Sequence, residues 1–193
     1  MRIDARAVER LRVDLRPRGY LRLTPLRFAA TPLGMGFGET RFASPSQAFR
    51  LVYIARTLVT AIAETMVRDR FVGRAARRVT EEEIEGWGVA AVTATEPLSL
   101  LDLRTTGAVM LGIPTNAVRG KAHGTGRRFS EALYRGFPKL DGILYPSRLT
   151  NDPCVAVYDR AVAKLEAGEV RPVIRQPRLV PALAALNVTV LAK

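Results

Sequence analysis

Four short stretches of this chain carry side chains that could bind and process a phosphorylated nucleotide. They are Tyr20-Leu-Arg22, Arg41-Phe42, Tyr53-Ile-Ala with Ala61-Ile-Ala-Glu64, and Asp141-Gly-Ile-Leu-Tyr-Pro-Ser147-Arg148. Together they supply guanidinium groups for an anion, aromatic faces, a carboxylate and a hydroxyl. Each stretch alone is a weak signal, but their order and spacing together indicate an enzyme.

The elements expected around these stretches would bring the side chains toward one another. Residues 49–55 have the β-branched and aromatic content of a buried strand. Thr57 is then a candidate N-cap for a helix whose apolar face includes Leu58, Ala61 and Ile62. Glu64 falls near the edge of that apolar face, where a carboxylate could face a cleft. Residues 142–145 are predicted as a strand that delivers Ser147 at its end.

The rest of the chain predicts a mixed α+β fold in a single domain with several short strands and helices. Thr80-Glu-Glu-Glu83 has the pattern of a capping box at the start of a short helix. Residues 31–42 are rich in glycine and are expected to form an irregular loop. We expect residues 1–19 to form an N-terminal arm or helix, and residues 20–193 to form the catalytic domain. Further strands are predicted at 20–23, 89–93, 98–103, 155–158 and 188–191, and further helices at 130–135 and 181–186.

Length and composition restrict the class of protein. The 193 residues are 48% hydrophobic, which suits one globular domain with a substantial core. No apolar run approaches the roughly 20 residues that span a bilayer, and the first residues lack the apolar segment of a signal peptide. A single cysteine, Cys154, excludes an internal disulfide. These features favour a cytoplasmic protein, and one cysteine with one histidine disfavours a zinc site.

The net charge of +12 has two readings. A basic protein can bind nucleic acid by neutralising phosphates. It can equally attract an anionic small substrate or an acidic protein partner. The cations cluster at residues 2–22 and 68–78 without the interleaved aromatic side chains on which bases stack. A nucleic-acid-binding module is therefore kept as an alternative to an enzyme.

The four stretches, taken in order, resemble the RES-domain family over roughly residues 20–158. The resemblance implies a fold related to that of ADP-ribosyltransferase toxins. It also implies the toxin half of a toxin–antitoxin pair that degrades NAD by phosphorolysis or hydrolysis, or that ADP-ribosylates a protein. The implied partner is an antitoxin, often with a helix-turn-helix domain. The resemblance implies no cofactor, since NAD would be the substrate and phosphate a potential co-substrate. Whether the protein forms a homodimer is left open.

The resemblance also assigns residues. Arg22 and Arg41 match the two family arginines, Tyr53 the tyrosine, Glu64 the glutamate and Ser147 the serine. Arg27 is a rival to Arg22, which we prefer because of its Tyr20-Leu context. Where the family often has a polar residue such as Asn after the second arginine, this chain has Ala43-Ser44.

These residue types suit cleavage of NAD. Arg22, Arg41 and Arg148 would bind phosphate oxygens through planar guanidinium groups. Glu64 would stabilise the positive charge that develops on the ribose. Tyr53 would stack on the nicotinamide or ribose, and Ser147 would donate a hydrogen bond to the substrate.

Each residue also has an ordinary structural explanation. Taken alone, an arginine is a solvated surface charge, Tyr53 is a core residue, Glu64 is an exposed helical charge and Ser147 is a turn residue. His123 is expected to be a loop residue, and Cys154 a buried strand residue that is no nucleophile. An inactive binding protein that retains the fold is a third alternative.

Overall fold

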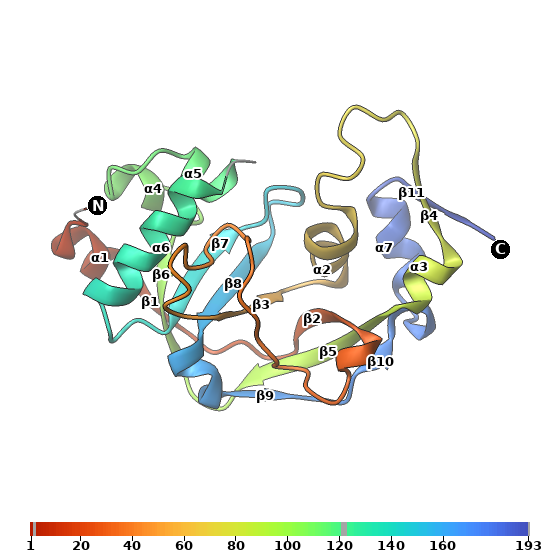
Figure 1. Ribbon diagram of the computed structural model, residues 1–193, viewed down its shortest axis with the longest axis horizontal. Helices are drawn as coiled ribbons and strands as arrows, with labels where there is room; N and C mark the ends of the chain where they lie inside the picture. The colour runs from red at the N-terminus through yellow and green to blue at the C-terminus, as the bar shows by residue number, and fades with distance from the viewer. Residues whose placement is uncertain (2, 121–122, 193) are drawn as a thin grey trace.

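A strongly curved sheet forms the framework of the molecule (Figure 1). The computed structural model describes residues 1, 3–120 and 123–192. Within these residues nine strands form one sheet in the order β1-β6-β7-β8-β3-β2-β5-β10, with β9 paired to β5. The strands are β1 (Arg12–Leu15), β2 (Tyr20–Pro25), β3 (Leu51–Ala55), β5 (Trp87–Ala94), β6 (Leu98–Asp102), β7 (Gly142–Pro146), β8 (Pro153–Tyr158), β9 (Leu165–Ala167) and β10 (Arg171–Pro172).

Within the main sheet of the described residues, the strand pairing is antiparallel except between β6 and β7. The chains of β7 and β8 approach closely at Gly142, where an added Cβ would lie 2.2 Å from the carbonyl oxygen of Ala156. Only glycine fits at this position. A second, smaller sheet holds β4 (Arg77–Thr80) and β11 (Val188–Leu191), which run parallel.

The central strands are buried on both faces. In β3, Val52 and Ile54 belong to one apolar cluster, while Leu51 and Ala55 belong to the other. Because successive strand residues point to opposite faces, the two clusters lie on opposite sides of the sheet. Tyr53 therefore faces the same side as Leu51 and Ala55, and this side carries the helix that bears Glu64.

The helices fall into two groups (Figure 1). One group, near β1 and β6, holds α1, α4, α5 and α6, and the other, toward β2 and β5, holds α2, α3 and α7. The helices are α1 (Ala5–Leu11), α2 (Leu58–Ile62), α3 (Glu81–Glu85), α4 (Gly107–Met110), α5 (Asn116–Arg119), α6 (Gly124–Gly136) and α7 (Leu179–Ala185). A π-helical turn, η2 (Ala63–Val67), continues α2, and 3₁₀ turns occur at η1 (Leu26–Phe28), η3 (Asp159–Lys164) and η4 (Val173–Arg175).

The mixed α+β architecture predicted from the sequence is confirmed, as are most of its elements. The side chain of Thr57 caps α2, and the predicted capping box at Thr80 and Glu83 is present at α3. The strand predicted at 188–191 is β11. Residues 31–42 form no helix or strand.

Three features differ from the expectation. Residues 1–19 contain a helix and also β1, which pairs with β6 at the edge of the main sheet. Helix α6 begins at Gly124, six residues before the predicted start, and its first turn contains Gly124 and Gly126, which in the sequence favour a loop. The short strands β4, β9 and β10 were not expected. No helix among the described residues is both long enough and apolar enough to span a bilayer.

Candidate active site

Glu64 lies where the helix after β3 changes its winding. Helix α2 is only five residues long and continues as the π-turn that contains Glu64. The amide of Arg68 closes this turn by donating to the carbonyl oxygen of Ala63 at 2.8 Å. Glu64 and its neighbour Thr65, both in this turn, line the two hollows described below. π-Turns of this kind occur frequently at functional sites.

Ser147 fixes the Glu64 carboxylate. Its hydroxyl donates a hydrogen bond of 2.6 Å to Oε1 of Glu64, although the two residues are 83 positions apart. The hydroxyl oxygen of Ser147 in turn accepts hydrogen bonds from the amides of Leu149 and Thr150 at 3.1 and 3.2 Å. Ser147 has no exposed surface. Ser147 therefore contacts Glu64 from the protein interior and not from the hollow. The sequence had led us to expect a direct contact between Ser147 and the substrate.

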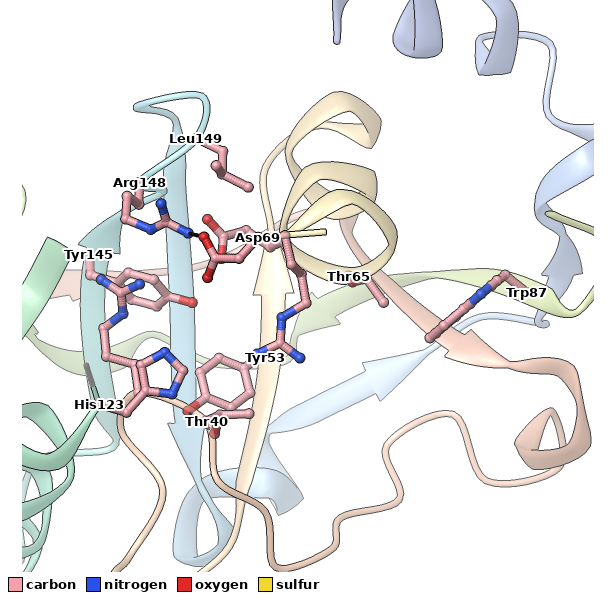
Figure 2. Close-up of a pocket in the computed structure, with 12 residues that line it drawn as sticks. Thr40, Tyr53, Thr65, Asp69, Trp87, His123, Tyr145, Arg148 and Leu149 are labelled. Atoms are coloured by element: carbon pink, nitrogen blue, oxygen red, sulfur yellow. Dashed lines mark hydrogen bonds and ion pairs between the residues drawn. The ribbon is translucent and has the colours of Figure 1, made fainter. Parts of the chain in front are cut away.

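Two adjoining hollows share Glu64 in their walls, and Figure 2 shows side chains that line the larger one. The larger hollow has a volume of about 280 Å³ and the smaller one about 180 Å³. Both are lined by Tyr53, Glu64, Thr65 and Tyr145. The larger hollow is also lined by Thr40, Arg41, Arg68, Asp69, Trp87, His123, Arg148 and Leu149. The smaller is also lined by Leu21, Arg22, Leu23, Leu51, Ile54, Ala55, Ala61 and Cys154.

Guanidinium groups line both hollows. Arg41 and Arg148, two of the predicted anion-binding residues, lie in the wall of the larger hollow. Nη1 of Arg41 donates to the carbonyl oxygen of Val118, which fixes the side chain. Burial lowers the pKa of Arg41, while the nearby Tyr145 and Glu64 raise it. The group remains cationic, because an arginine is not deprotonated in proteins, and so a partly desolvated positive charge faces the hollow.

Arg22 supplies the guanidinium of the smaller hollow. Its Nη2 donates to the carbonyl oxygen of Gly34 at 2.5 Å, and burial lowers its pKa. Its buried Nε has no hydrogen-bond partner among the described residues. The rival Arg27 is exposed in η1, with its guanidinium 4.9 Å from the ring centroid of Phe28, and lines neither hollow. The geometry therefore favours Arg22.

Two phenols stand beside the carboxylate. Tyr53 shares a 2.8 Å hydrogen bond with the Thr40 hydroxyl and accepts the amide of Phe42 at 3.3 Å. Burial raises the pKa of Tyr53 to about 12, despite these hydrogen bonds. Burial also raises the pKa of Tyr145, whose ring packs edge-on against Phe42 at 5.0 Å. Both phenols are therefore neutral at physiological pH.

Several lining residues were not assigned a role from the sequence. Tyr145 lies within the fourth stretch, where the sequence predicts a strand residue without a role in the site. His123 immediately precedes α6, and its Nδ1–H donates to the carbonyl oxygen of Glu39 at 2.8 Å. Figure 2 shows His123 grouped with Tyr53 and Tyr145, and Trp87 on the other side of the hollow. The one feature of the sequence that could have pointed to His123 as a site residue is that it is the only histidine of the chain.

Cys154 lies in the floor of the smaller hollow. It belongs to β8, directly opposite Tyr145 of β7, and is 2% exposed. Burial raises the pKa of its thiol well above the usual range, with Glu64 adding to the effect. A protonated thiol is a poor nucleophile. This placement agrees with the expected buried strand residue.

Comparison with known proteins identifies the family. The model of the RES domain matches residues 12–179. The chain belongs to the RES-domain family. It is 36% identical over 109 residues to a protein of Sinorhizobium fredii named "Probable toxin y4kH", an overlap of 56% of this chain and 86% of that protein.

The fold has a counterpart among solved structures. A chain from the crystal structure of the M. tuberculosis MbcT–MbcA toxin–antitoxin complex superposes with a TM-score of 0.67. The superposition covers 94% of this chain and 98% of that one, at 19% sequence identity. At this identity the likeness concerns the fold alone. Every residue that lines the two hollows lies within the segment matched to the RES domain.

Proposed function

We propose that this RES-domain protein is a toxin that cleaves the nicotinamide–ribose bond of NAD. The observation that carries the proposal is the Glu64 carboxylate, held by Ser147 at the border of two hollows. A cationic guanidinium lines each hollow, Arg41 in the larger and Arg22 in the smaller. Negative charge at the centre and positive charge on both sides suit a dinucleotide that reacts at its ribose.

The charges of the substrate match those of the site. The pyrophosphate of NAD is anionic and suits guanidinium groups, which bind phosphate oxygens in a bidentate manner. The combined volume of the two hollows falls within the range of ordinary small-molecule sites, roughly 300–1,000 Å³. The rings of Tyr53 and Tyr145 offer aromatic surfaces against which the nicotinamide or ribose would pack.

The reaction breaks the bond between the ribose anomeric carbon and the nicotinamide nitrogen, and the bonding electrons leave with nicotinamide. Positive charge develops on the ribose, and the Glu64 carboxylate stabilises it. An acceptor oxygen then bonds to the same carbon and loses its proton to Glu64 or to solvent. Water as acceptor gives ADP-ribose, phosphate gives ADP-ribose 1-phosphate, and a protein side chain gives an ADP-ribosylated protein.

An antitoxin is the proposed protein partner. One relative is named a probable toxin, and the structural neighbour comes from a toxin–antitoxin complex. With a net charge of +12, this chain would favour an antitoxin that presents acidic groups to it. We extend the proposal to an antitoxin with a helix-turn-helix domain and to action in the cytoplasm, where NAD is available.

The test is to incubate the purified protein with NAD, with and without phosphate, and to separate the products by chromatography. Glu64→Gln removes the carboxylate charge with little change in shape. We expect turnover to fall at least about a hundredfold, or about 2.7 kcal/mol on the barrier.

Glu169→Gln is the matched control, because it removes one carboxylate at a side chain that is 80% exposed and lines neither hollow. It should retain full turnover. Normal turnover by a folded Glu64→Gln protein would refute the role of Glu64. An unchanged NAD pool together with tight, salt-dependent binding of DNA or RNA would instead favour the nucleic-acid-binding alternative.

A further inference from the structure

An ion pair joins two loops at the wall of the larger hollow. Asp69 lies in the loop between η2 and β4 (residues 68–76), and Arg148 lies in the loop between β7 and β8 (residues 147–152). Nη2 of Arg148 contacts Oδ1 of Asp69, and the dashed line in Figure 2 marks this contact. Both residues line the hollow beside Glu64. The loops are thus connected through a cation that could itself bind an anionic ligand.

The contact with Asp69 leaves hydrogen-bond donors of the Arg148 guanidinium without an acceptor. The Arg148 side chain is 22% exposed and that of Asp69 is 45% exposed. The buried Nε of Arg148 finds no hydrogen-bond acceptor among the described residues. A guanidinium carries five N–H donors in a fixed fork, whereas the carboxylate contacts one terminal nitrogen. A phosphoryl group, with its several oxygens, offers more acceptors than this contact uses.

The charges around the larger hollow favour an anion. Among the described residues, its wall holds the guanidinium groups of Arg41, Arg68 and Arg148 and the carboxylates of Glu64 and Asp69. Glu64 is bound by the Ser147 hydroxyl. Asp69 is therefore the carboxylate that competes most directly with an incoming anion for Arg148.

The backbone directly beside Asp69 is strained. Arg68 has φ of +42° and ψ of −129°, a conformation that non-glycine residues rarely adopt. Such a conformation persists only where surrounding contacts maintain it. The amide of Arg68 is held by its hydrogen bond to the carbonyl oxygen of Ala63, and the ion pair of Asp69 lies immediately beyond it, so Asp69 follows a fixed point of the backbone.

We propose that Asp69 is an internal competitor for the phosphoryl group that Arg148 binds. Its carboxylate occupies Arg148 in the free protein and is displaced when a phosphoryl group enters the larger hollow. The phosphoryl group comes from the dinucleotide or from free orthophosphate, and in naming it the inference rests on the proposed function. Because the ion pair is partly exposed, it is weak enough to exchange reversibly. Asp69 thus sets the affinity for the anion.

Isothermal titration calorimetry with ADP-ribose and, separately, with orthophosphate tests this inference. We expect Asp69→Asn to lower the Kd of at least one of the two ligands roughly threefold to tenfold, since it removes both the competitor and a repelling charge. The ligand that responds identifies the source of the phosphoryl group. Arg148→Gln should weaken binding of the same ligand, and adding Asp69→Asn to Arg148→Gln should give much less gain.

Glu169→Gln again controls for the change in net charge and should leave both Kd values unaltered. Asp69→Ala provides a second variant if Asp69→Asn fails to fold. Unchanged Kd values in the Asp69 variants would overturn the inference, as would an equal gain without Arg148 or a lack of binding of both ligands to every variant. Because the readout is binding, a protein that binds these ligands but leaves NAD intact would refute the proposed function without refuting the role of Asp69.

Discussion

Among the described residues, the hydroxyl of Ser147 makes three hydrogen bonds, and each of them helps to position Glu64. One goes to the carboxylate itself, and two come from the amides of Leu149 and Thr150. The serine therefore connects the carboxylate to the backbone of the loop after β7. In the proposed reaction it is a positioning residue, since it acts through Glu64 and lines neither hollow.

Ser147→Ala separates positioning from substrate binding. The change leaves two backbone amides and one carboxylate oxygen without their partner, and we expect the free energy of unfolding to fall by about 2–3 kcal/mol. The freed carboxylate should lower kcat roughly tenfold, with KM for NAD nearly unchanged. Urea denaturation and steady-state kinetics measure the two effects. A large rise in KM with constant kcat would show instead that Ser147 contacts the substrate.

Among individual residues, the sequence singled out the charged side chains and Tyr53 but neither Tyr145 nor Trp87. Arg22 and Arg41 were expected to bind phosphate and Glu64 to face a cleft, and all three line the hollows. Tyr145 could not be told from a core residue, because apolar neighbours surround it in β7. Trp87 is the first residue of β5, and no local pattern of the sequence relates it to Glu64.

At the scale of elements, the start of α2 is joined to the loop that carries Ser147. Oδ2 of Asp152 accepts the Thr57 hydroxyl at 2.9 Å, and Oδ1 accepts Nη2 of Arg56 at 2.7 Å. The carbonyl oxygen of Asp152 accepts the amide of Ser147 at 2.8 Å. One aspartate thus connects the helix that leads to Glu64 with the loop that fixes it.

Asp152→Asn should therefore destabilise the protein in a pH-dependent manner. Burial raises the pKa of Asp152, but hydrogen bonds from Thr57, Arg56 and Thr60 outweigh it, so the folded-state pKa is lowered. The stabilisation is then fully present above the ordinary carboxyl pKa of about 3.9 and is lost as the pH falls through the folded-state value.

We expect the variant to lose about 1–2 kcal/mol at neutral pH and to approach the wild type in acid. Urea denaturation at a series of pH values measures this. A difference between the two proteins that stays constant down to the lowest pH would contradict the assignment.

Long, buried strands could be predicted from the sequence, whereas very short strands could not. Strands β3, β7 and β8 are five or six residues long and apolar on both faces, so they stand out as apolar runs. Strands β9 and β10 have three and two residues and show little apolar pattern. They form because β5 offers free backbone groups, which is a property of the tertiary structure.

At the scale of the whole molecule, the sheet order brings the four sequence stretches together. Strands β7, β8, β3 and β2 are successive neighbours, although β2 and β7 are far apart in the chain. The side chains of Tyr53 and Tyr145 consequently project from strands separated only by β8. The sequence could predict these strands, but their order depends on non-local pairing that local patterns do not contain.

The far edge of this sheet is completed by the first residues of the chain. Strand β1 pairs with β6 from Arg12 to Leu15, and helix α1 buries Ala7 and Val8 against the core. Removal of this segment would leave the backbone N–H and C=O groups on one side of β6 without strand partners. It would also expose to water the apolar surface that α1 covers. An unprotected edge strand of this kind is prone to pair with other chains.

Deletion of residues 1–15 should consequently lower stability and promote association, even though the segment lines neither hollow. We expect a loss of at least about 3 kcal/mol from the buried side chains and strand pairing, which corresponds to a fall in Tm of about 6–12 °C. Differential scanning calorimetry and size-exclusion chromatography measure both effects. Glu9→Gln, which weakens the exposed pair with Arg12 but keeps the segment, should stay within about 0.5 kcal/mol of the wild type. A truncated protein that is monomeric and equally stable would show that β6 can form the edge of the sheet without β1.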